Sequence, residues 1–210
     1  MDDVIARGIV PGLRERKKLD TRRALSDAAL ELTLERGLDN VTREDIAERA
    51  GVSLRTFSNY FTGKHDALVY RQVERMRRAL ALFLERPGDE PLWSAITESV
   101  LRPLEDDGAA DMLPTPQQLA TIRVLAADLD TRFAASKQVF ADWVDAVAQR
   151  LGVDPSRDVY PRIVVGTIAA VADAAMTVYA HSDPPVPLPT LMRTGFAAVT
   201  AGLPGPGGAK

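Results

Sequence analysis

The chain has 210 residues, 46% of them hydrophobic and 26% charged, with a formal net charge of −3. This apolar content suffices for a buried core and excludes an intrinsically disordered chain. With no cysteine and two histidines, the composition excludes a disulfide scaffold, a thiolate or multi-histidine metal site and a thiol nucleophile. We expect no metal, no cofactor and no enzymatic activity. The absence of a signal-peptide pattern and of an 18-residue apolar run predicts a cytoplasmic protein with no membrane partner.

The charge is unevenly distributed along the chain. Residues 14–23 (RERKKLDTRR) carry six basic and two acidic side chains, so the other 200 residues carry a net −7. A basic stretch on an acidic body is typical of a protein that binds a polyanion at one end. The alternative is an ordinary solvent-exposed helix start.

Helical periodicity dominates the sequence and sustained two-residue alternation is absent, which predicts an all-α fold. Clusters of proline and glycine must separate the helices. The predicted helices are 18–36, 43–50, 54–60, 64–86, 92–106, 115–128, 131–151, 157–182 and 188–202. We assign residues 1–18 to a flexible basic arm, 19–66 to an N-terminal three-helix domain, 67–203 to a larger helical domain and 204–210 to a disordered tail.

Two of the short helices form a predicted helix-turn-helix over residues 42–61. Thr42 and Ser53 are placed to cap the two helices, and only A-G-V-S joins them, with Gly51 at the bend. So short a connection makes the helices cross steeply. Phe57 and Phe61, four residues apart, are expected to point together into the core.

The opposite face of the second helix carries Arg55, Thr56 and Asn59, with Tyr60 beside them. In the major groove an arginine can bind guanine, an asparagine can bind adenine and a threonine methyl can contact thymine. These residue types favour DNA recognition. Alternatively, they are polar residues on a solvated face.

The run T-x-x-D-I-A-x-x-A-G-V-S-x-x-T-F-x-x-Y-F, within about 50 similar residues, resembles the N-terminal domain of TetR-family transcriptional regulators. The resemblance implies a recognition helix at Leu54–Asn59 and phosphate contacts at Thr42, Tyr60 and Lys64. The DNA-binding residues that we predict in this domain are Thr42, Ser53, Leu54, Arg55, Thr56, Asn59, Tyr60 and Lys64. Two departures from the family pattern are Thr33, where phenylalanine is usual, and Gly63-Lys64-His65, where Ser-Lys-Glu is usual.

The basic residues before the first predicted helix, among them Arg14, Lys17 and Lys18, form the proposed arm. Such an arm can reach a minor groove and add phosphate contacts. The alternative is again a solvated face.

The last two helices are the predicted dimer interface. The segments 162–180 and 190–203 are rich in small and apolar residues, so they cannot be fully exposed. The predicted interface residues are Ile163, Gly166, Ala170, Ala174, Val178, Met192 and Phe196. By resemblance to the family, these helices would pair across a homodimer as a four-helix bundle; an ordinary intrachain core is the alternative.

The middle helices would then enclose a pocket for a small hydrophobic effector. The predicted pocket residues are Trp93, Met112, Arg123, Phe133, Phe140 and Trp143. Each could instead be a plain core residue, and Arg123 could bind an anion or pair with an acid. Residues 119–164 are similar to the ligand-binding half of acyl-CoA-like binders in the TetR family, which implies an acyl-CoA or similar effector.

Together these features predict a homodimer that binds double-stranded DNA at a palindromic operator and is released by its effector, with the helix at 64–86 connecting the two events. The alternative function is a helical protein-interaction adaptor without sequence-specific DNA binding.

Overall fold

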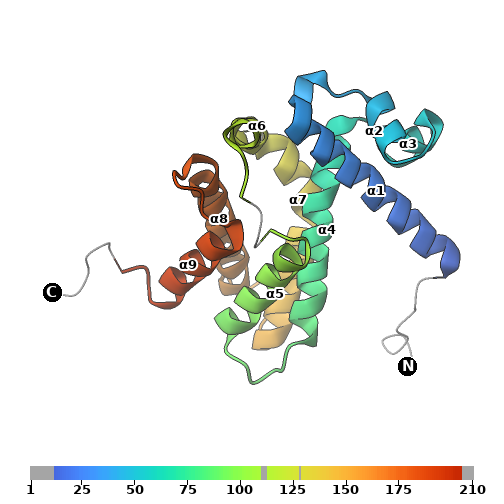
Figure 1. Ribbon diagram of the computed structural model, residues 1–210. Helices are drawn as coiled ribbons and strands as arrows, with labels where there is room; N and C mark the ends of the chain where they lie inside the picture. The colour runs from blue at the N-terminus through green and yellow to red at the C-terminus, as the bar shows by residue number, and fades with distance from the viewer. Residues whose placement is uncertain (1–11, 110–112, 128, 205–210) are drawn as a thin grey trace. The chain divides into compact units, whose positions relative to one another are not determined.

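The computed structural model describes residues 12–109, 113–127 and 129–204, with the side chains of all of these except Glu15 and residues 124–136. Every regular element in these residues is a helix (Figure 1). The elements are α1 Leu13–Arg36, the 3₁₀ turn η1 Leu38–Asn40, α2 Arg43–Arg49, α3 Leu54–Tyr60, α4 Lys64–Glu85, α5 Leu92–Asp106, α6 Pro116–Ala127, α7 Leu129–Leu151, α8 Tyr160–His181 and α9 Leu188–Thr200. The all-α prediction is confirmed.

The first helix begins at Leu13, five residues before the predicted start. Its first bond joins Arg16 N–H to Gly12 O at 3.0 Å. Arginine, lysine and glutamate are good helix formers, so the basic run extends α1. The prediction of a flexible arm is therefore wrong for residues 13–18. Residues 1–11 lie outside the described part of the chain, as do residues 205–210 of the predicted tail.

The start of α8 also differs from the prediction, by three residues. Asp154 accepts hydrogen bonds from the amide and hydroxyl of Ser156, and Asp158 accepts one from Tyr160 N–H at 2.8 Å. Aspartate side chains that bond to nearby amides favour turns over helix. They delay the helix until Tyr160.

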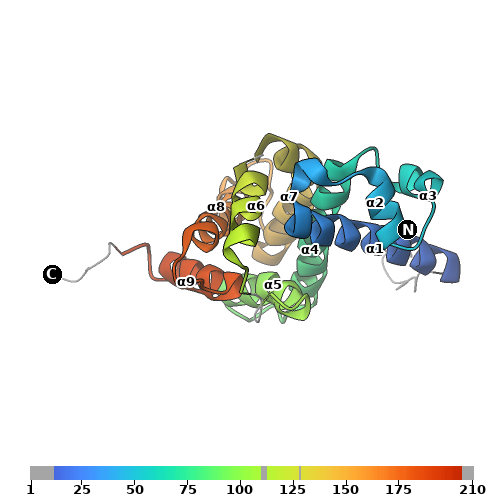
Figure 2. The ribbon, with the colours of Figure 1, turned by 45° about the horizontal axis from the view of Figure 1, so that its top comes forward.

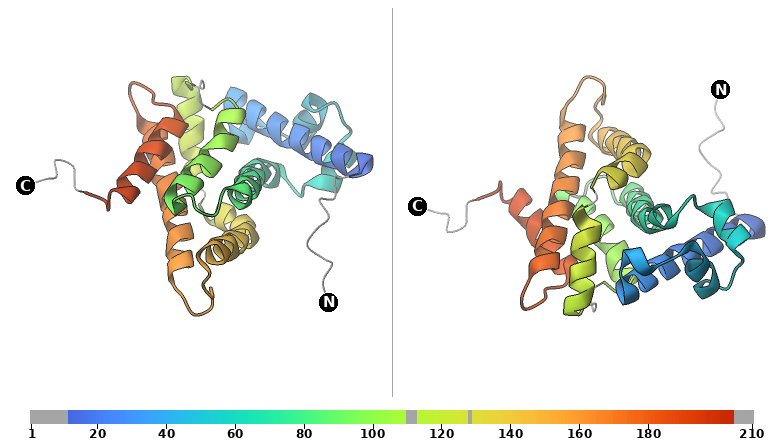
Figure 3. Two further views of the ribbon diagram at one scale, coloured as in Figure 1. Left: turned by 90° about the horizontal axis from the view of Figure 1, so that it is seen from below. Right: turned by 90° about the horizontal axis from the view of Figure 1, so that it is seen from above.

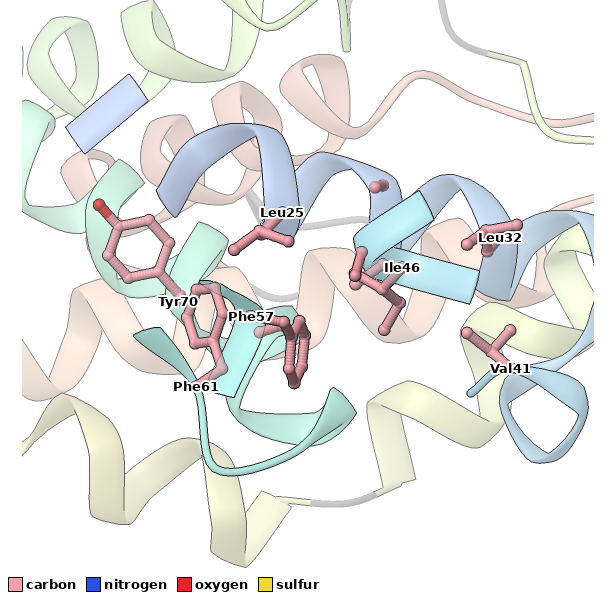
Figure 4. Packing of buried hydrophobic residues seen from close by; sticks show 11 residues of the cluster. Leu25, Leu32, Val41, Ile46, Phe57, Phe61 and Tyr70 are labelled. Carbon is pink, nitrogen blue, oxygen red and sulfur yellow. The ribbon is translucent and has the colours of Figure 1, made fainter. Parts of the chain in front are cut away.

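The chain forms two compact units, residues 1–71 and 72–210. The core of the first unit joins α1, α2, α3 and the first turns of α4 (Figure 4). The apolar face predicted for α1, Leu25, Ala28, Ala29 and Leu32, is buried in it. Val41, Ile46, Phe57, Phe61 and Tyr70 complete the large side chains of this core. Burial of these faces fixes the rotation of each short helix about its own axis.

Polar contacts also fix the start of α4 to α1. The buried Ser26 hydroxyl donates to Ala67 O at 2.6 Å, and Arg71 pairs with Asp27. The guanidinium of Arg22 lies 4.4 Å from the centre of the Tyr70 ring, which adds a cation–π contact. The first two turns of α4 are thus part of the first unit.

In the second unit, α8 contacts α6, α7 and α9, and α5 contacts α9. Figure 2 shows α6 beside α8 and α9 beside α5. Figure 3 shows the length of α8 between α7 and α9. At the crossing of α8 and α9, a Cβ added to Gly195 would lie 2.7 Å from Val171 Cγ1, so the approach requires glycine.

Two side chains of α7 hold the second-unit part of α4 and the loop after it. Trp143 stacks at 5.2 Å between ring centres on Phe83 and donates its indole N–H to Met76 O. Arg150 donates to Pro87 O and to Glu90 O, at 2.5 and 2.8 Å.

By length and composition, α8 is the one helix in the described residues that could cross a membrane. Such a helix also occurs in the core of many soluble proteins. Its contacts with three neighbouring helices account for part of its apolar surface.

Candidate nucleic-acid interface

A tight turn places α3 directly after α2. Gly51 has φ +67°, a conformation that favours glycine. Its N–H donates to Glu48 O at 3.0 Å, and Val52 N–H donates to Ala47 O at 2.9 Å. This pair of bonds is the Schellman motif, which ends α2 and turns the chain. The role predicted for Gly51 is confirmed.

The start of α2 is held by a capping box. Asp45 N–H donates to the hydroxyl of Thr42 at 3.1 Å, and Thr42 N–H donates to the carboxylate of Asp45 at 2.9 Å. The Thr42 hydroxyl also donates to that carboxylate. These bonds from Thr42, and then the charge of Arg36, hold the pKa of Asp45 below its ordinary value although partial burial opposes them.

The start of α3 is capped by Ser53, whose hydroxyl oxygen accepts from Thr56 N–H at 3.1 Å. Phe57 and Phe61 are both buried and their ring centres are 5.9 Å apart, as the sequence predicts. Because these two rings face the core, the opposite face of α3 is turned to solvent.

That solvent face presents Arg55, Ser58 and Asn59, all exposed. Thr56 and Tyr60 flank it half-buried, and Leu54, at the first turn, is 38% exposed. Within the described residues, the side chains of Arg55 and Asn59 have no hydrogen-bond or ion-pair partner. Arginine and asparagine are the two residue types that bind guanine and adenine edges bidentately.

Two arginines near the helix-turn-helix, Arg49 and Arg36, are paired within the unit. Arg49 binds Glu35 at 2.9 Å and Glu31 at 3.3 Å, and its hydrogen bond is the main cause that lowers the pKa of Glu35. Arg36 pairs with Asp45 at 3.7 Å. Arg43, by contrast, is exposed and has no ion-pair partner among the described residues. Sequence reasoning missed Arg43; its place directly after the Thr42 cap was the available signal.

Arg14, Lys17 and Lys18 are exposed on the first two turns of α1. At spacings of three and four residues they share one side of the helix. Their cations are therefore presented by a helix. Lys18 also takes part in an intramolecular contact.

Lys64, the first residue of α4, is half-buried. Its ammonium donates to Leu38 O at 2.7 Å and to Val41 O at 3.1 Å. Two of its three donors are thus bound to the backbone just before α2.

The structure separates the predicted pocket residues into different contacts. The ring of Trp93 lies 6.4 Å from that of Phe196, while Trp143 is buried against Phe83. Phe140 is half-buried on α7. Met112 and the side chain of Phe133 lie outside the described residues.

Arg123 donates from Nε to Ala180 O, at 2.7 Å, near the end of α8. This bond satisfies a carbonyl that the helix end leaves without an amide. The position of the Arg123 side chain is therefore explained without a bound anion or an acidic partner. Five further arginines on α4, on α5 and just after α4 are paired with acids: Arg71 with Asp27, Arg75 and Arg78 with Asp107, Arg86 with Glu90, and Arg102 with Asp106.

The predicted dimer residues divide into two groups. On α8, Ile163 and Val178 are 54% and 49% exposed, and Ala170 and Ala174 are exposed as well. Gly166 is partly exposed on the same helix. On α9 the prediction needs correction: Met192 and Phe196 are buried inside their own chain, because α9 turns its large side chains toward α5 and α8. They belong to the intrachain core.

Comparison with known proteins places the two units in known families. Residues 25–69 match the family described as bacterial regulatory proteins, tetR family, and residues 90–204 match the MftR C-terminal domain. The chain is 33% identical over 177 residues to the HTH-type transcriptional regulator TcmR of Streptomyces glaucescens, covering 77% of this chain and 74% of that protein.

Solved structures share the fold. The fatty acid degradation regulator FadR from Bacillus halodurans matches with a TM-score of 0.58 and 18% identity, covering 87% of this chain and 96% of that one. SmeT, the repressor of the Stenotrophomonas maltophilia multidrug efflux pump SmeDEF, matches with a TM-score of 0.54 and 16% identity, covering 87% and 91%.

Proposed function

Because the chain belongs to the TetR family of bacterial transcriptional regulators, we propose that it is a homodimeric repressor whose two α3 helices read a palindromic operator. The family makes it a DNA-binding regulator and not an enzyme. We expect it in the cytoplasm, with the DNA that it binds.

The observation that carries the proposal is the solvent face of α3. Arg55 and Asn59 are exposed there without an intramolecular partner in the described part of the chain. Free donors and acceptors on a short helix after a tight turn are what direct readout in a major groove requires. Arg43 and the cations of α1 supply charge for phosphate contacts.

A dimer follows from the small reach of one recognition helix. A helix of seven residues reads few base pairs, and two-fold symmetry doubles the number. The exposed apolar positions of α8, Ile163, Ala170, Ala174 and Val178, supply a surface that a second copy would cover. The small residues among them permit close approach of two helices.

The test is selection of bound fragments from a randomised duplex library by the purified protein. We expect the selected sequences to contain an inverted repeat whose half-site centres lie one turn of the DNA helix, or a multiple of it, apart. The double variant Arg55→Ala/Asn59→Ala is the matched control, because these substitutions remove both exposed side chains and do not alter the buried face of α3. Enrichment of unrelated sequences by the wild type would contradict the proposal.

We further propose a small hydrophobic effector that binds the second unit and weakens operator binding. Thermodynamic linkage requires DNA to weaken effector binding by the same factor. An acyl chain is the chemistry that we propose to test first. The fatty acid degradation regulator FadR shares the fold, which leaves the effector of this chain open.

Because most arginines near α4 and α5 already have acidic partners, an acyl-CoA would have to displace those partners to use them for its phosphates. Fatty acids and acyl-CoAs of equal chain length should therefore be compared. Operator release by both supports recognition of the acyl chain, release by the CoA ester alone supports recognition of its phosphates, and release by neither contradicts an acyl effector.

A further inference from the structure

Of the three polar side chains that are buried in the described residues, Ser99 on α5 differs from the other two. Ser26 donates to Ala67 O at 2.6 Å, and Thr33 donates to Ala29 O at 2.7 Å. The hydroxyl of Ser99, a residue that is 1% exposed, has no hydrogen-bond partner in the described part of the chain. A buried polar group without a partner is unfavourable for folding, so its presence needs an explanation.

A serine in a helix can satisfy its hydroxyl locally, by donating to the carbonyl four residues before it. Thr97, two residues earlier in α5, bonds in this way to Trp93 O at 2.7 Å. Ser99 does not make the corresponding bond to Ala95 O. Its hydroxyl therefore remains available to a group that is not part of the helix.

The backbone carbonyl of Ser99 also lacks its helical partner. In an α-helix this carbonyl would accept from the amide of residue 103. Residue 103 is a proline inside α5, and proline has no N–H. A proline inside a helix is itself unfavourable. Two unfavourable features thus coincide at one buried residue, which offers a hydroxyl without a partner and a carbonyl without its amide.

Ser99 lies on the side of α5 that faces away from α9. Glu98 pairs with Arg193 of α9 at 3.2 Å, and a step of one residue turns about 100° around the helix axis. Asp107, about two turns after Ser99, pairs with Arg78 of α4 at 2.8 Å. The side that carries Ser99 is therefore turned toward α4, inside the second unit.

We propose that Ser99 binds an uncharged hydroxyl group of the effector: the ligand oxygen accepts from the Ser99 hydroxyl, and the ligand O–H donates to the Ser99 carbonyl. A hydroxyl is the simplest group that both donates and accepts. A carboxylate only accepts, and its charge would be buried beside a carbonyl oxygen. The inference rests on the proposed effector site in the second unit and adds the hydroxyl that the effector carries.

Two variants each withdraw one of the two groups. Ser99→Ala removes the unpartnered hydroxyl, and Pro103→Ala restores the amide that pairs with the carbonyl. Without ligand, neither variant should be less stable to urea than the wild type, because each removes an unfavourable feature of α5. Ser94→Ala, at an exposed serine of the same helix, is the matched control.

The probes are decan-1-ol and its isomer 1-methoxynonane, an ether of the same atoms that has no O–H. Tryptophan fluorescence follows the titrations, since Trp93 lies on α5. The wild type should bind the alcohol about 3- to 10-fold more tightly than the ether, the value of one hydrogen bond. Ser99→Ala should weaken binding of both probes, because both oxygens accept from its hydroxyl. Pro103→Ala should weaken binding of the alcohol alone, and Ser94→Ala should change neither.

Equal affinities of the alcohol and the ether in the wild type would overturn the proposal, as would unchanged affinities in Ser99→Ala. Lower stability of both variants would overturn it as well, because Ser99 and Pro103 would then serve the fold. Selection of a duplex measures DNA binding separately. A wild type that selects a duplex but does not bind decan-1-ol would refute only the role of Ser99. A wild type that binds decan-1-ol but selects no duplex would refute the proposed regulator and leave the role of Ser99 standing.

Discussion

On the outer face of α3, the side chains of Arg55 and Asn59 have no partner inside the described part of the first unit. Arg49 and Arg36 are paired with glutamate or aspartate, whereas Arg55 and Asn59 reach solvent unpaired in the described part of the chain. A polar side chain without an intramolecular partner loses little when it binds elsewhere. Binding energy at this surface should therefore be concentrated in a few side chains.

Replacement of Arg55 by alanine tests this concentration. A bidentate contact with a base discriminates by about 1–3 kcal/mol, so Arg55→Ala should weaken binding to the selected duplex roughly 5- to 150-fold. Ser58→Ala, on the same exposed face, is the matched control and should change affinity less than Arg55→Ala. Fluorescence anisotropy measures both. Equal losses for the two variants would contradict the role of Arg55.

The capping box predicts an acid-sensitive contribution to stability. The hydroxyl and amide of Thr42 lower the pKa of Asp45 in the folded protein, so ionised Asp45 favours folding above its unfolded pKa of about 3.9, and this contribution is lost as pH falls through the folded value.

Urea unfolding at pH 7 and at roughly pH 3 measures this contribution. The difference in free energy of unfolding between wild type and Asp45→Asn should be larger at pH 7. Asp39→Asn, at an exposed acid in the neighbouring turn, corrects for the change in net charge. An unchanged difference for Asp45→Asn would show that the carboxylate charge adds nothing to the cap.

At the scale of elements, local signals predict most helices and their ends. Gly51 and the caps at Thr42 and Ser53 lie within a few residues of the ends that they fix, so the turn before α3 can be read from the sequence. The starts of α1 and α8 could not be predicted from the sequence. A run of charged residues can form a helix or a flexible arm, and an aspartate can cap a helix or stabilise a turn.

Contacts between residues that are far apart in the sequence could not be predicted either. Arg71 pairs with Asp27, 44 residues away, and Lys64 bonds to carbonyls more than 20 residues away. Tertiary packing selects such partners, and spacing along one helix does not reveal them. For the same reason Met192 and Phe196 could not be assigned to core or interface from their apolar character alone.

The crossing of α8 and α9 gives a prediction at this scale. Gly195→Ala would place a methyl against Val171, whose branched side chain cannot move aside easily, so overpacking should cost about 1–3 kcal/mol of unfolding free energy. Val171→Ala opens that space. The double variant should therefore be less destabilised than the sum of the two single variants, as measured by chemical denaturation. Additive losses would mean that the helices separate freely at this point.

For the whole molecule, assembly and DNA binding should be linked through α8. An acid at two exposed apolar positions, Ile163→Glu/Val178→Glu, should place like charges in the proposed dimer face and yield monomers by sedimentation velocity. Affinity for the palindromic duplex should fall with dimerisation. Leu84→Glu on α4, where the leucine is 59% exposed, is the control and should leave the dimer intact. If the double variant remained a dimer, the dimer interface would not include Ile163 and Val178.

The most direct test of DNA readout by α3 is to repeat the duplex selection with Asn59→Ala. The wild type should yield an inverted repeat. Asn59→Ala should lose its base preference at one position in each half-site, related by the two-fold axis, and keep the remaining positions. An identical sequence from both proteins would show that Asn59 does not read bases, and loss of every preference at once would show that it acts on the fold of α3 and not on a base pair.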